Sequence, residues 1–226
     1  MGRHPAAPGL LLTTGRSCLF ITLTIGVATG GPLVRFDRSM AEILHTYDSD
    51  ASGLTYFFHI VSILGPLEVL ALVGVLVALA LLVQRSWLTL AVWLVAVLGG
   101  EALNLLIKDL FARPRPSFER PMVVETSYSF PSGQAMESLV VYGMLAYFTV
   151  LTLRSQRARA VSVGGAALIV VLIGLSRVYL GAHYVSDVVG GFAAGGAWLG
   201  AVVTVTAWEA MRRRDTANRR DQMNSL

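Results

Sequence analysis

The sequence is poor in charge. Asp, Glu, Lys and Arg make up only 14% of its 226 residues, whereas soluble domains carry roughly 25%. Hydrophobic residues account for 54%, and the mean hydropathy is +0.63. This composition excludes an intrinsically disordered chain and disfavours a soluble globule.

Cysteine is almost absent as well. Cys18 is the only one, and it lies within an apolar run, so an intramolecular disulfide and a Cys-based zinc site are both excluded. Clustered carboxylates and paired histidines are also missing from the sequence, and we therefore expect no metal and no other cofactor. Nucleic acid is not an expected partner, because the basic residues behind the net charge of +4 lie between apolar runs.

Apolar runs of membrane-crossing length recur along the whole chain, and each crossing needs about 20 mostly apolar residues. The predicted fold is all-α, a single domain over 1–226 built as an integral membrane bundle of six transmembrane helices. Its motif-bearing core covers about 100–210, and a basic tail, expected to be loosely ordered, covers about 211–226. The expected spans are about 11–31, 60–83, 87–107, 133–153, 161–180 and 187–209.

Arginines indicate how the bundle is oriented. An even number of spans puts both termini on one side, and the segments on that side hold Arg85, three arginines over 154–159 and the arginines of the tail. By the positive-inside rule this side is cytoplasmic, so the other face points outside or into a periplasm. A signal peptide also fits the first run, but an uncleaved anchor is preferred. On the opposite face, segment 32–59 is predicted to form an amphipathic helix lying in the interface.

Three cations are expected to emerge on the outer face: Lys108 at the end of the third span, Arg115 seven residues later, and Arg177 near the end of the fifth. Any one of them alone is best explained by snorkelling to the headgroups. Together they indicate an anion site, because charge at such depth is expensive and usually functional.

Two further elements suit an anion. Ser132 and Gly133 start the fourth span, where unpaired backbone N–H groups and the helix dipole attract negative charge; Ser132 is either the helix cap or a ligand. His183 and Asp187 lie four residues apart, so a helix beginning by His183 would place them on one face. Asp187 would then orient the imidazole, leaving its other nitrogen as a nucleophile or base.

In this order, these elements resemble the signature of the type 2 phosphatidic acid phosphatase (PAP2) superfamily. K-x6-R-P is met by Lys108, Arg115 and Pro116, and S-R-x5-H-x3-D by Ser176, Arg177, His183 and Asp187. P-S-G-H is met at Pro131, Ser132 and Gly133 but not at Gln134. The resemblance implies a metal-independent lipid phosphatase in which Lys108, Arg115, Ser132, Gly133 and Arg177 bind phosphate. His183 would form a phosphohistidine, oriented by Asp187.

Gln134 stands where the family has a histidine that protonates the leaving oxygen. Glutamine has no titratable proton, so we expect activity to fall by about 10²- to 10⁴-fold while phosphate binding survives. The sequence leaves open whether Gln134 is a natural divergence or a deliberate substitution, and the second is favoured because every other motif position is intact.

The expected substrate is a lipid phosphate: phosphatidic acid, phosphatidylglycerol phosphate or a polyprenyl diphosphate such as undecaprenyl diphosphate. A bacterial inner or plasma membrane is the expected location. The main alternative is a catalytically silent lipid-phosphate-binding protein, for which Gln134 would be the marker. A transporter is disfavoured, since the charges gather at one face and no inverted repeat is visible. The sequence does not predict the oligomeric state.

Polar residues outside the motifs receive structural interpretations. Arg113 and Arg120 are interpreted as solvated residues of the outer loop. Glu101 and Asn104 favour a helix–helix hydrogen bond over a role near the site. For Glu137, a packing role and an influence on Gln134 are equally favoured.

Overall fold

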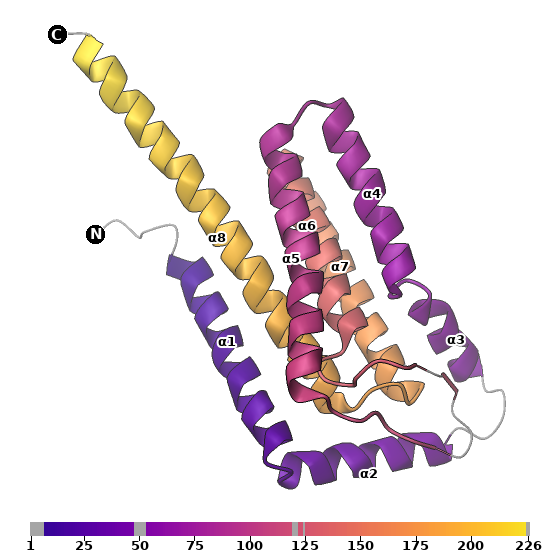
Figure 1. The fold of residues 1–226 in the computed structure, drawn as a ribbon. Coiled ribbons are helices and arrows are strands. Elements are labelled where there is room, and N and C mark those ends of the chain that lie inside the picture. Colours follow the sequence, from indigo (N-terminus) through magenta and orange to yellow (C-terminus); the bar gives the residue numbers. More distant parts are fainter. Residues whose placement is uncertain (1–6, 48–52, 119–121, 124, 225–226) are drawn as a thin grey trace.

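The computed structural model of the chain describes residues 7–47, 53–118, 122, 123 and 125–224. Within these ranges all regular structure is helical, which confirms the predicted all-α class (Figure 1). The helices are α1 (Ala7–Ala28), α2 (Pro32–Tyr47), α3 (Gly53–Ser62), α4 (Leu67–Val83), α5 (Trp87–Phe111), α6 (Gly133–Thr152), α7 (Gln156–Tyr179) and α8 (Val185–Asn224).

Four helical segments are long and apolar enough to cross a membrane by themselves: α5, α6, α7 and the Val185–Glu209 part of α8. They coincide with the last four predicted spans. Two bent pairs raise the number to 6 if each pair is counted as one span: α1 with α2, bent by 83°, and α3 with α4, bent by 43°. The structure therefore has four to six candidate membrane spans, and it reaches the predicted six only when both bent pairs are counted as spans.

The break between α3 and α4 corrects the continuous span predicted at 60–83. Helix α3 ends at Ser62 and α4 begins at Leu67. Pro66 precedes α4, and its ring both fixes φ and removes the N–H that a continuous helix would use. Gly65 lies against α6, where an added Cβ would come within 2.6 Å of Gln134 Oε1. The break thus places the corner between α3 and α4 against Gln134, the one motif position that differs from the PAP2 pattern.

The tail also differs from expectation. It was predicted to be loosely ordered, but α8 continues through it to Asn224. Residues 209–224 contain no glycine or proline and are rich in arginine, which favours helix. The backbone of the basic tail is therefore a continuation of the last span.

Helix α2 runs across one end of the bundle (Figure 1). The chain turns into it at Gly30, whose φ of +66° is a left-handed conformation that glycine adopts without strain. Phe36 and Ile43 are exposed, whereas Asp37 and Ala41 are buried against the bundle. The amphipathic helix predicted within segment 32–59 is confirmed; its place in the membrane interface stays a prediction.

Helix α6 is the centre of the bundle and packs against α5, α7 and α8. Its approach to α8 depends on Gly191 and Gly195, because a Cβ at either position would come within 2.8 Å of an α6 backbone oxygen. Such small residues spaced four apart allow helices to pack closely in a membrane. The principal core cluster lies beside this contact and consists of Leu70, Trp93, Ala96, Val140, Val141, Met144 and Val202.

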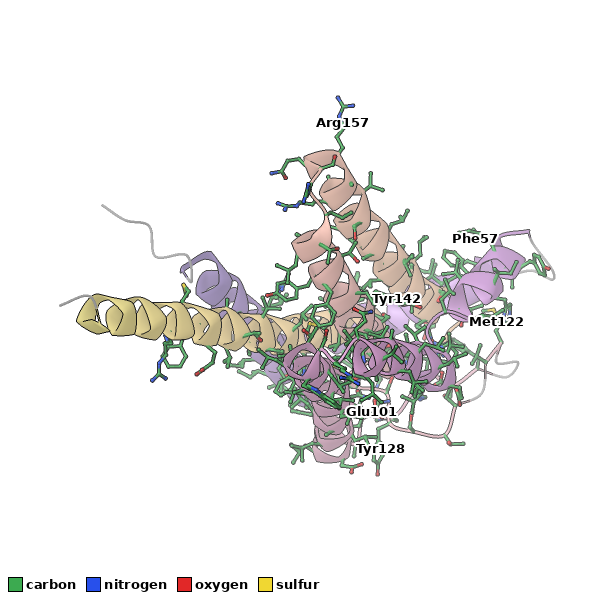
Figure 2. The ribbon with its side chains drawn as sticks, turned by 90° about the horizontal axis from the view of Figure 1, so that it is seen from above. Phe57, Glu101, Met122, Tyr128, Tyr142 and Arg157 are labelled. Atoms are coloured by element: carbon green, nitrogen blue, oxygen red, sulfur yellow. The ribbon has the colours of Figure 1, made fainter. Side chains whose placement is uncertain are left out.

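The start of α1 and the end of α8 lie at one end of the bundle, while α2 and the loop after α5 lie at the other (Figure 1). The connection between α6 and α7 is at the same end as the termini. Viewed along the bundle, Arg157 in the first turn of α7, next to this connection, projects away from the molecule (Figure 2). This arrangement agrees with the predicted separation of the arginine-rich segments from the motif-bearing loops.

Candidate active site

Lys108 lies in the last turn of α5 and is only 7% exposed. The helix ends at Ala112, which has a left-handed conformation, and Pro114 and Pro116 follow. The chain then returns past α5, so that Lys108 Nζ donates to the carbonyl oxygen of Tyr128 at 2.8 Å and to Ser127 Oγ at 3.3 Å. The ammonium group is therefore held inside the protein by the returning loop and does not snorkel outward.

Arg115 lies on the same returning loop. Its Nε donates to the Ser127 carbonyl at 2.6 Å, and NH1 donates to the Ala182 carbonyl at 2.8 Å. NH1 also lies 3.0 Å from His183 Nε2. Burial lowers the pKa of Arg115, and the nearby carboxylate of Glu125 opposes this shift. This guanidinium joins the outer loop to the imidazole.

Arg177 comes from the last turn of α7 and is 2% exposed. It donates through NH1 to Ser62 Oγ at 2.9 Å and through NH2 to Glu125, while its Nε has no partner. Lys108, Arg115 and Arg177 thus converge at one site, as the sequence predicted. What the sequence analysis missed is the carboxylate between the two arginines.

Glu125 bridges the arginines. Its Oε1 pairs with Arg177, and its Oε2 lies 2.8 Å from Arg115 NH2. Burial alone would raise the pKa of this carboxyl group, but Arg177 and Arg115 outweigh it and hold the pKa below its ordinary value. No sequence pattern marks this residue, which lies in an irregular loop; the charge balance of three convergent cations is the only signal that an acidic partner was needed.

His183 lies two residues before α8, so the condition of a helix beginning by His183 is not met. Because a guanidinium only donates hydrogen bonds, the contact with Arg115 requires Nε2 to carry a lone pair and places the proton on Nδ1. Nδ1 faces Asp187 Oδ2 at 3.6 Å, beyond hydrogen-bond distance. Burial lowers the pKa of His183 to about 4. The imidazole is therefore neutral near pH 7, with its basic nitrogen directed away from Asp187.

Asp187 is fully buried in the first turn of α8, and hydrogen bonds hold both carboxylate oxygens. Oδ1 accepts from Arg113 NH1, and Oδ2 accepts from Ser129 Oγ and, at 2.9 Å, from the Tyr184 backbone N–H. The interpretation of Arg113 as a solvated loop residue is wrong, because its side chain is 8% exposed and also pairs with Asp37 at 2.9 Å. Arg120 lies outside the described residues.

Asp37 extends this arrangement to α2. Its Oδ1 accepts from the Ser186 backbone N–H at 3.0 Å, and its Oδ2 accepts from the Ser186 hydroxyl. Ser186 Oγ also accepts from Arg113 NH1 at 2.8 Å. A buried set of ionic and polar contacts thus connects α2 with Asp187. Sequence reasoning missed it because Asp37 and Arg113 are 76 residues apart.

The start of α6 supplies the remaining predicted residues. Ser132 precedes the helix, and its hydroxyl is buried without a partner, so it does not act as the side-chain cap. Its backbone N–H donates to the Asp187 carbonyl at 2.9 Å. Gly133 has the Asn104 amide beside it, since a Cβ at that glycine would lie 2.9 Å from Asn104 Nδ2. Gln134 Oε1 is also buried without a partner.

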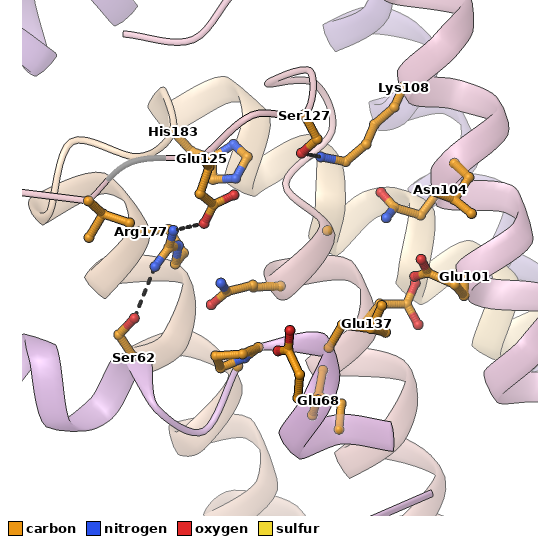
Figure 3. Close-up of a pocket in the computed structure, with 18 residues that line it drawn as sticks. Ser62, Glu68, Glu101, Asn104, Lys108, Glu125, Ser127, Glu137, Arg177 and His183 are labelled. Atoms are coloured by element: carbon orange, nitrogen blue, oxygen red, sulfur yellow. Dashed lines mark hydrogen bonds and ion pairs between the residues drawn. The ribbon is translucent and has the colours of Figure 1, made fainter. Parts of the chain in front are cut away.

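A cavity of about 570 Å³ joins these groups. Figure 3 shows Lys108, Arg177, His183 and Glu125 towards one end, and Glu68, Glu101 and Glu137 towards the other. Gly133 and Gln134 also line the cavity, while Asp187, Ser132 and Arg115 are not part of its lining. No group of three His, Cys, Asp or Glu side chains in the described ranges could hold a metal ion, and the expectation that none is required stays a prediction.

Two curated proteins are similar in sequence. The chain is 44% identical over 115 residues to phosphatidylglycerophosphatase B of Bacillus subtilis (strain 168), covering 50% of this chain and 55% of that protein. It is 32% identical over 110 residues to lipid phosphate phosphatase delta of Arabidopsis thaliana, covering 44% and 26%. The aligned part therefore spans about half, and about a quarter, of these relatives.

A solved structure supports the same relationship. The fold matches the crystal structure of a transmembrane PAP2 type phosphatidylglycerolphosphate phosphatase from Bacillus subtilis with a TM-score of 0.77 and 29% identity, covering 87% of this chain and 96% of that one. Membrane-spanning helices and this likeness together make the chain an integral membrane protein. The PAP2 superfamily model matches residues 87–211, from α5 into α8. The chain belongs to the PAP2 superfamily.

Proposed function

We propose that the protein is a membrane lipid phosphatase that transfers the phosphoryl group of its substrate to His183 and then to water. The observation that carries the proposal is the state of His183: its Nε2 lone pair faces Arg115, and Nδ1 faces the buried Asp187. A neutral imidazole held in this tautomer is a competent nucleophile at neutral pH. The phosphatase names of the relatives support the same reaction class.

The first step forms a bond between His183 Nε2 and phosphorus and breaks the bond from phosphorus to the leaving oxygen. Asp187 stabilises the positive charge that develops on the ring, because its carboxylate faces the Nδ1 proton. In the second step water attacks phosphorus, the N–P bond breaks and free phosphate leaves with the water oxygen; water supplies the proton that the leaving oxygen takes up, so that one water is consumed per lipid. The protein requires no metal in this scheme.

Lys108, Arg115 and Arg177 are proposed to bind the phosphate oxygens, with the N–H groups of Gly133 and Gln134 and the hydroxyl of Ser132 at the start of α6. Such preorganised cations and dipoles stabilise the charge spread over the equatorial oxygens. In the structure the carboxylate of Glu125 lies between Arg115 and Arg177, where a phosphate would bind. Phosphate and this carboxylate compete for the same cations, so Glu125 must move aside when substrate binds.

Gln134 limits the reaction, because it has no proton to give to the leaving oxygen. A phosphate monoester of an alcohol needs that proton most, since an alkoxide is a poor leaving group. A lipid diphosphate releases an already stable phosphate anion and loses less. The substrate is a lipid phosphate on the extracytoplasmic face; phosphatidic acid, phosphatidylglycerol phosphate and a polyprenyl diphosphate are the candidates. The alternative, a lipid-phosphate-binding protein without turnover, is favoured by Gln134 alone.

The test is metal-free phosphate release in detergent from this chain and from its Gln134→His variant on each of the three lipids. We expect a gain of about 100-fold in the variant, largest on a monoester, as general acid catalysis typically contributes. A His183→Ala version of the variant is the matched control and must be inactive. Binding of lipid phosphate without release by either chain would replace the phosphatase with the binding protein.

A further inference from the structure

Glu137 is a buried carboxyl group that the proposed reaction leaves unused. It lies on α6, is only 4% exposed, and its Oε1 has no hydrogen-bond partner. Glu101 of α5 is its charged neighbour and also interacts electrostatically with Lys108, whereas no cation compensates Glu137 within the described residues. A buried carboxylate without a cation is costly, so burial favours the neutral acid. Glu137 therefore brings a proton into the cavity.

The position of Glu137 on α6 places this acid beside Gln134. The two residues are three apart, so they share one face of the helix, and both line the cavity. Side chains of an α-helix lean towards its N-terminus, and the N-terminus of α6 is where phosphate is proposed to bind. Glu137 lies four residues, or about 6 Å along the axis, beyond Gly133. A side chain that leans back over this distance, alone or through one water, reaches an oxygen bonded to phosphorus.

The direction of phosphoryl transfer puts the leaving oxygen on the side of Glu137. The attacking nitrogen and the leaving oxygen lie roughly in line, on opposite sides of phosphorus. Figure 3 shows His183 and Glu137 on opposite sides of the cavity. Glu101 and Glu137 also line a neighbouring space of about 200 Å³ between α4 and α5, whose other walls are apolar. The hydrocarbon part of a lipid fits there, so the oxygen that joins it to phosphorus passes Glu137.

Resting on the proposed function, we propose that Glu137 donates the proton to the leaving oxygen, in place of the histidine of the PAP2 pattern. In the first step the bond between His183 and phosphorus forms, the bond from phosphorus to the leaving oxygen breaks, and the Glu137 proton passes to that oxygen. In the second step the Glu137 carboxylate takes a proton from the attacking water while the bond between His183 and phosphorus breaks. One water is consumed, and Glu137 is again the acid.

The test varies the leaving group. It compares two phosphates with the same long chain, one joined through an alkyl oxygen and one through a nitrophenyl oxygen, which leaves as a stable anion without a proton. In Glu137→Gln we expect kcat/KM, which reports the first step, to fall at least tenfold for the alkyl phosphate and less than threefold for the nitrophenyl phosphate. Glu68→Gln, the same change on α4 in the same cavity, is the matched control and should keep the ratio of the two values.

The Gln134→His background supplies a second comparison. There the histidine donates the proton, so Glu137→Gln should change kcat/KM for the alkyl phosphate less than threefold. Activity in this background also shows that the substitution leaves the fold intact. Equal losses on the two phosphates, or an equal loss in both backgrounds, would overturn the proton-donor role and leave Glu137 a packing residue.

Failure of the proposed function gives a different result. If neither the unmodified chain nor the Gln134→His variant releases phosphate from any lipid, the phosphatase and the role of Glu137 fall together. If the Gln134→His variant is active and the unmodified chain is not, the phosphatase stands and Glu137 is not the proton donor.

Discussion

The two sides of His183 differ in how completely their polar groups are satisfied. Behind the ring, both oxygens of Asp187 are hydrogen-bonded within a buried set of contacts that reaches Asp37, although His183 Nδ1 itself lies 3.6 Å from Asp187 and has no partner. In front, Arg177 Nε and Gln134 Oε1 belong to residues that line the cavity and have no partners, and the Ser132 hydroxyl at the start of α6 has none either. The rear side is fixed before any substrate arrives, and the front side is completed by what binds. Changes behind the ring should lower kcat and stability, and changes in front should alter affinity and selectivity.

Asp187→Asn gives the largest expected effect. The amide removes the charge that faces the Nδ1 proton and leaves Arg113 with one buried carboxylate instead of two. In comparable His–Asp arrangements the same change lowers turnover by about 10⁴-fold. Phosphate release measured in the more active Gln134→His background should fall by about 10³-fold or more. Asp109→Asn, an exposed carboxylate near the end of α5, is the control; equal losses in both variants would contradict a specific role for Asp187.

Asp37→Asn should mainly lower the stability of the protein and its kcat. It breaks a buried ion pair with Arg113, a change that typically costs about 3–5 kcal/mol. We expect a lower midpoint of thermal unfolding in detergent and a lower kcat, with KM nearly unchanged. Arg35→Gln, an exposed change on the same helix, should alter neither. A rise in KM without a fall in kcat would place Asp37 on the substrate side.

Glu125→Gln probes the front side. The amide no longer competes with phosphate for Arg115 and Arg177, so inorganic phosphate should inhibit or bind about fivefold more tightly, as expected if the two ion pairs of this partly exposed carboxylate are together worth ~1 kcal/mol. The measurement is the inhibition constant of phosphate, or its dissociation constant if the chain is inactive. Weaker binding would show that Glu125 helps to hold the cations in place and does not occupy the anion position.

The smallest of the expected effects is that of pH on stability, which should be negligible near pH 7. Because the folded pKa of His183 is about 4, below its ordinary value of 6.5, its contribution to stability is complete above pH 6.5 and is lost as pH falls towards 4. The lowered pKa of Glu125 acts in the same direction. NMR of 13C-labelled histidine, with His183→Ala for assignment, should show the ring neutral at pH 5.5. Protonation near 6.5 would contradict its burial.

The sequence predicted the helices best where long apolar runs are not interrupted by proline, as in α5 to α7. It misplaced the span at 60–83 because the apolar run reads on through Gly65 and Pro66, and the bend depends on how that corner packs against α6. The tail was misjudged because polarity was interpreted as looseness, although its residues favour helix.

Motif spacing pointed to the three cations, the start of α6, His183 and Asp187, which the fold brings near one another; their roles in phosphate binding and catalysis stay predictions. It offered nothing on Arg113, Asp37 and Glu125, because each takes its role from partners far away in sequence. Glu137 and Asn104 show a related limit. Their side of the helix becomes visible only when α4, α5 and α6 enclose a cavity between them.

Helix α2 extends the consequences of this structure beyond the site. It turns 83° from α1 and leaves Phe36 and Ile43 exposed while Asp37 reaches into the protein. A helix of this kind feels the lateral pressure and composition of the lipid around it. Through Asp37 and Arg113 the same helix is connected to Asp187, so under the proposed function, and with α2 in the interface as predicted, a change in the bilayer would reach the residue that faces His183. Turnover in bilayers of different curvature stress should therefore differ even at equal substrate mole fraction.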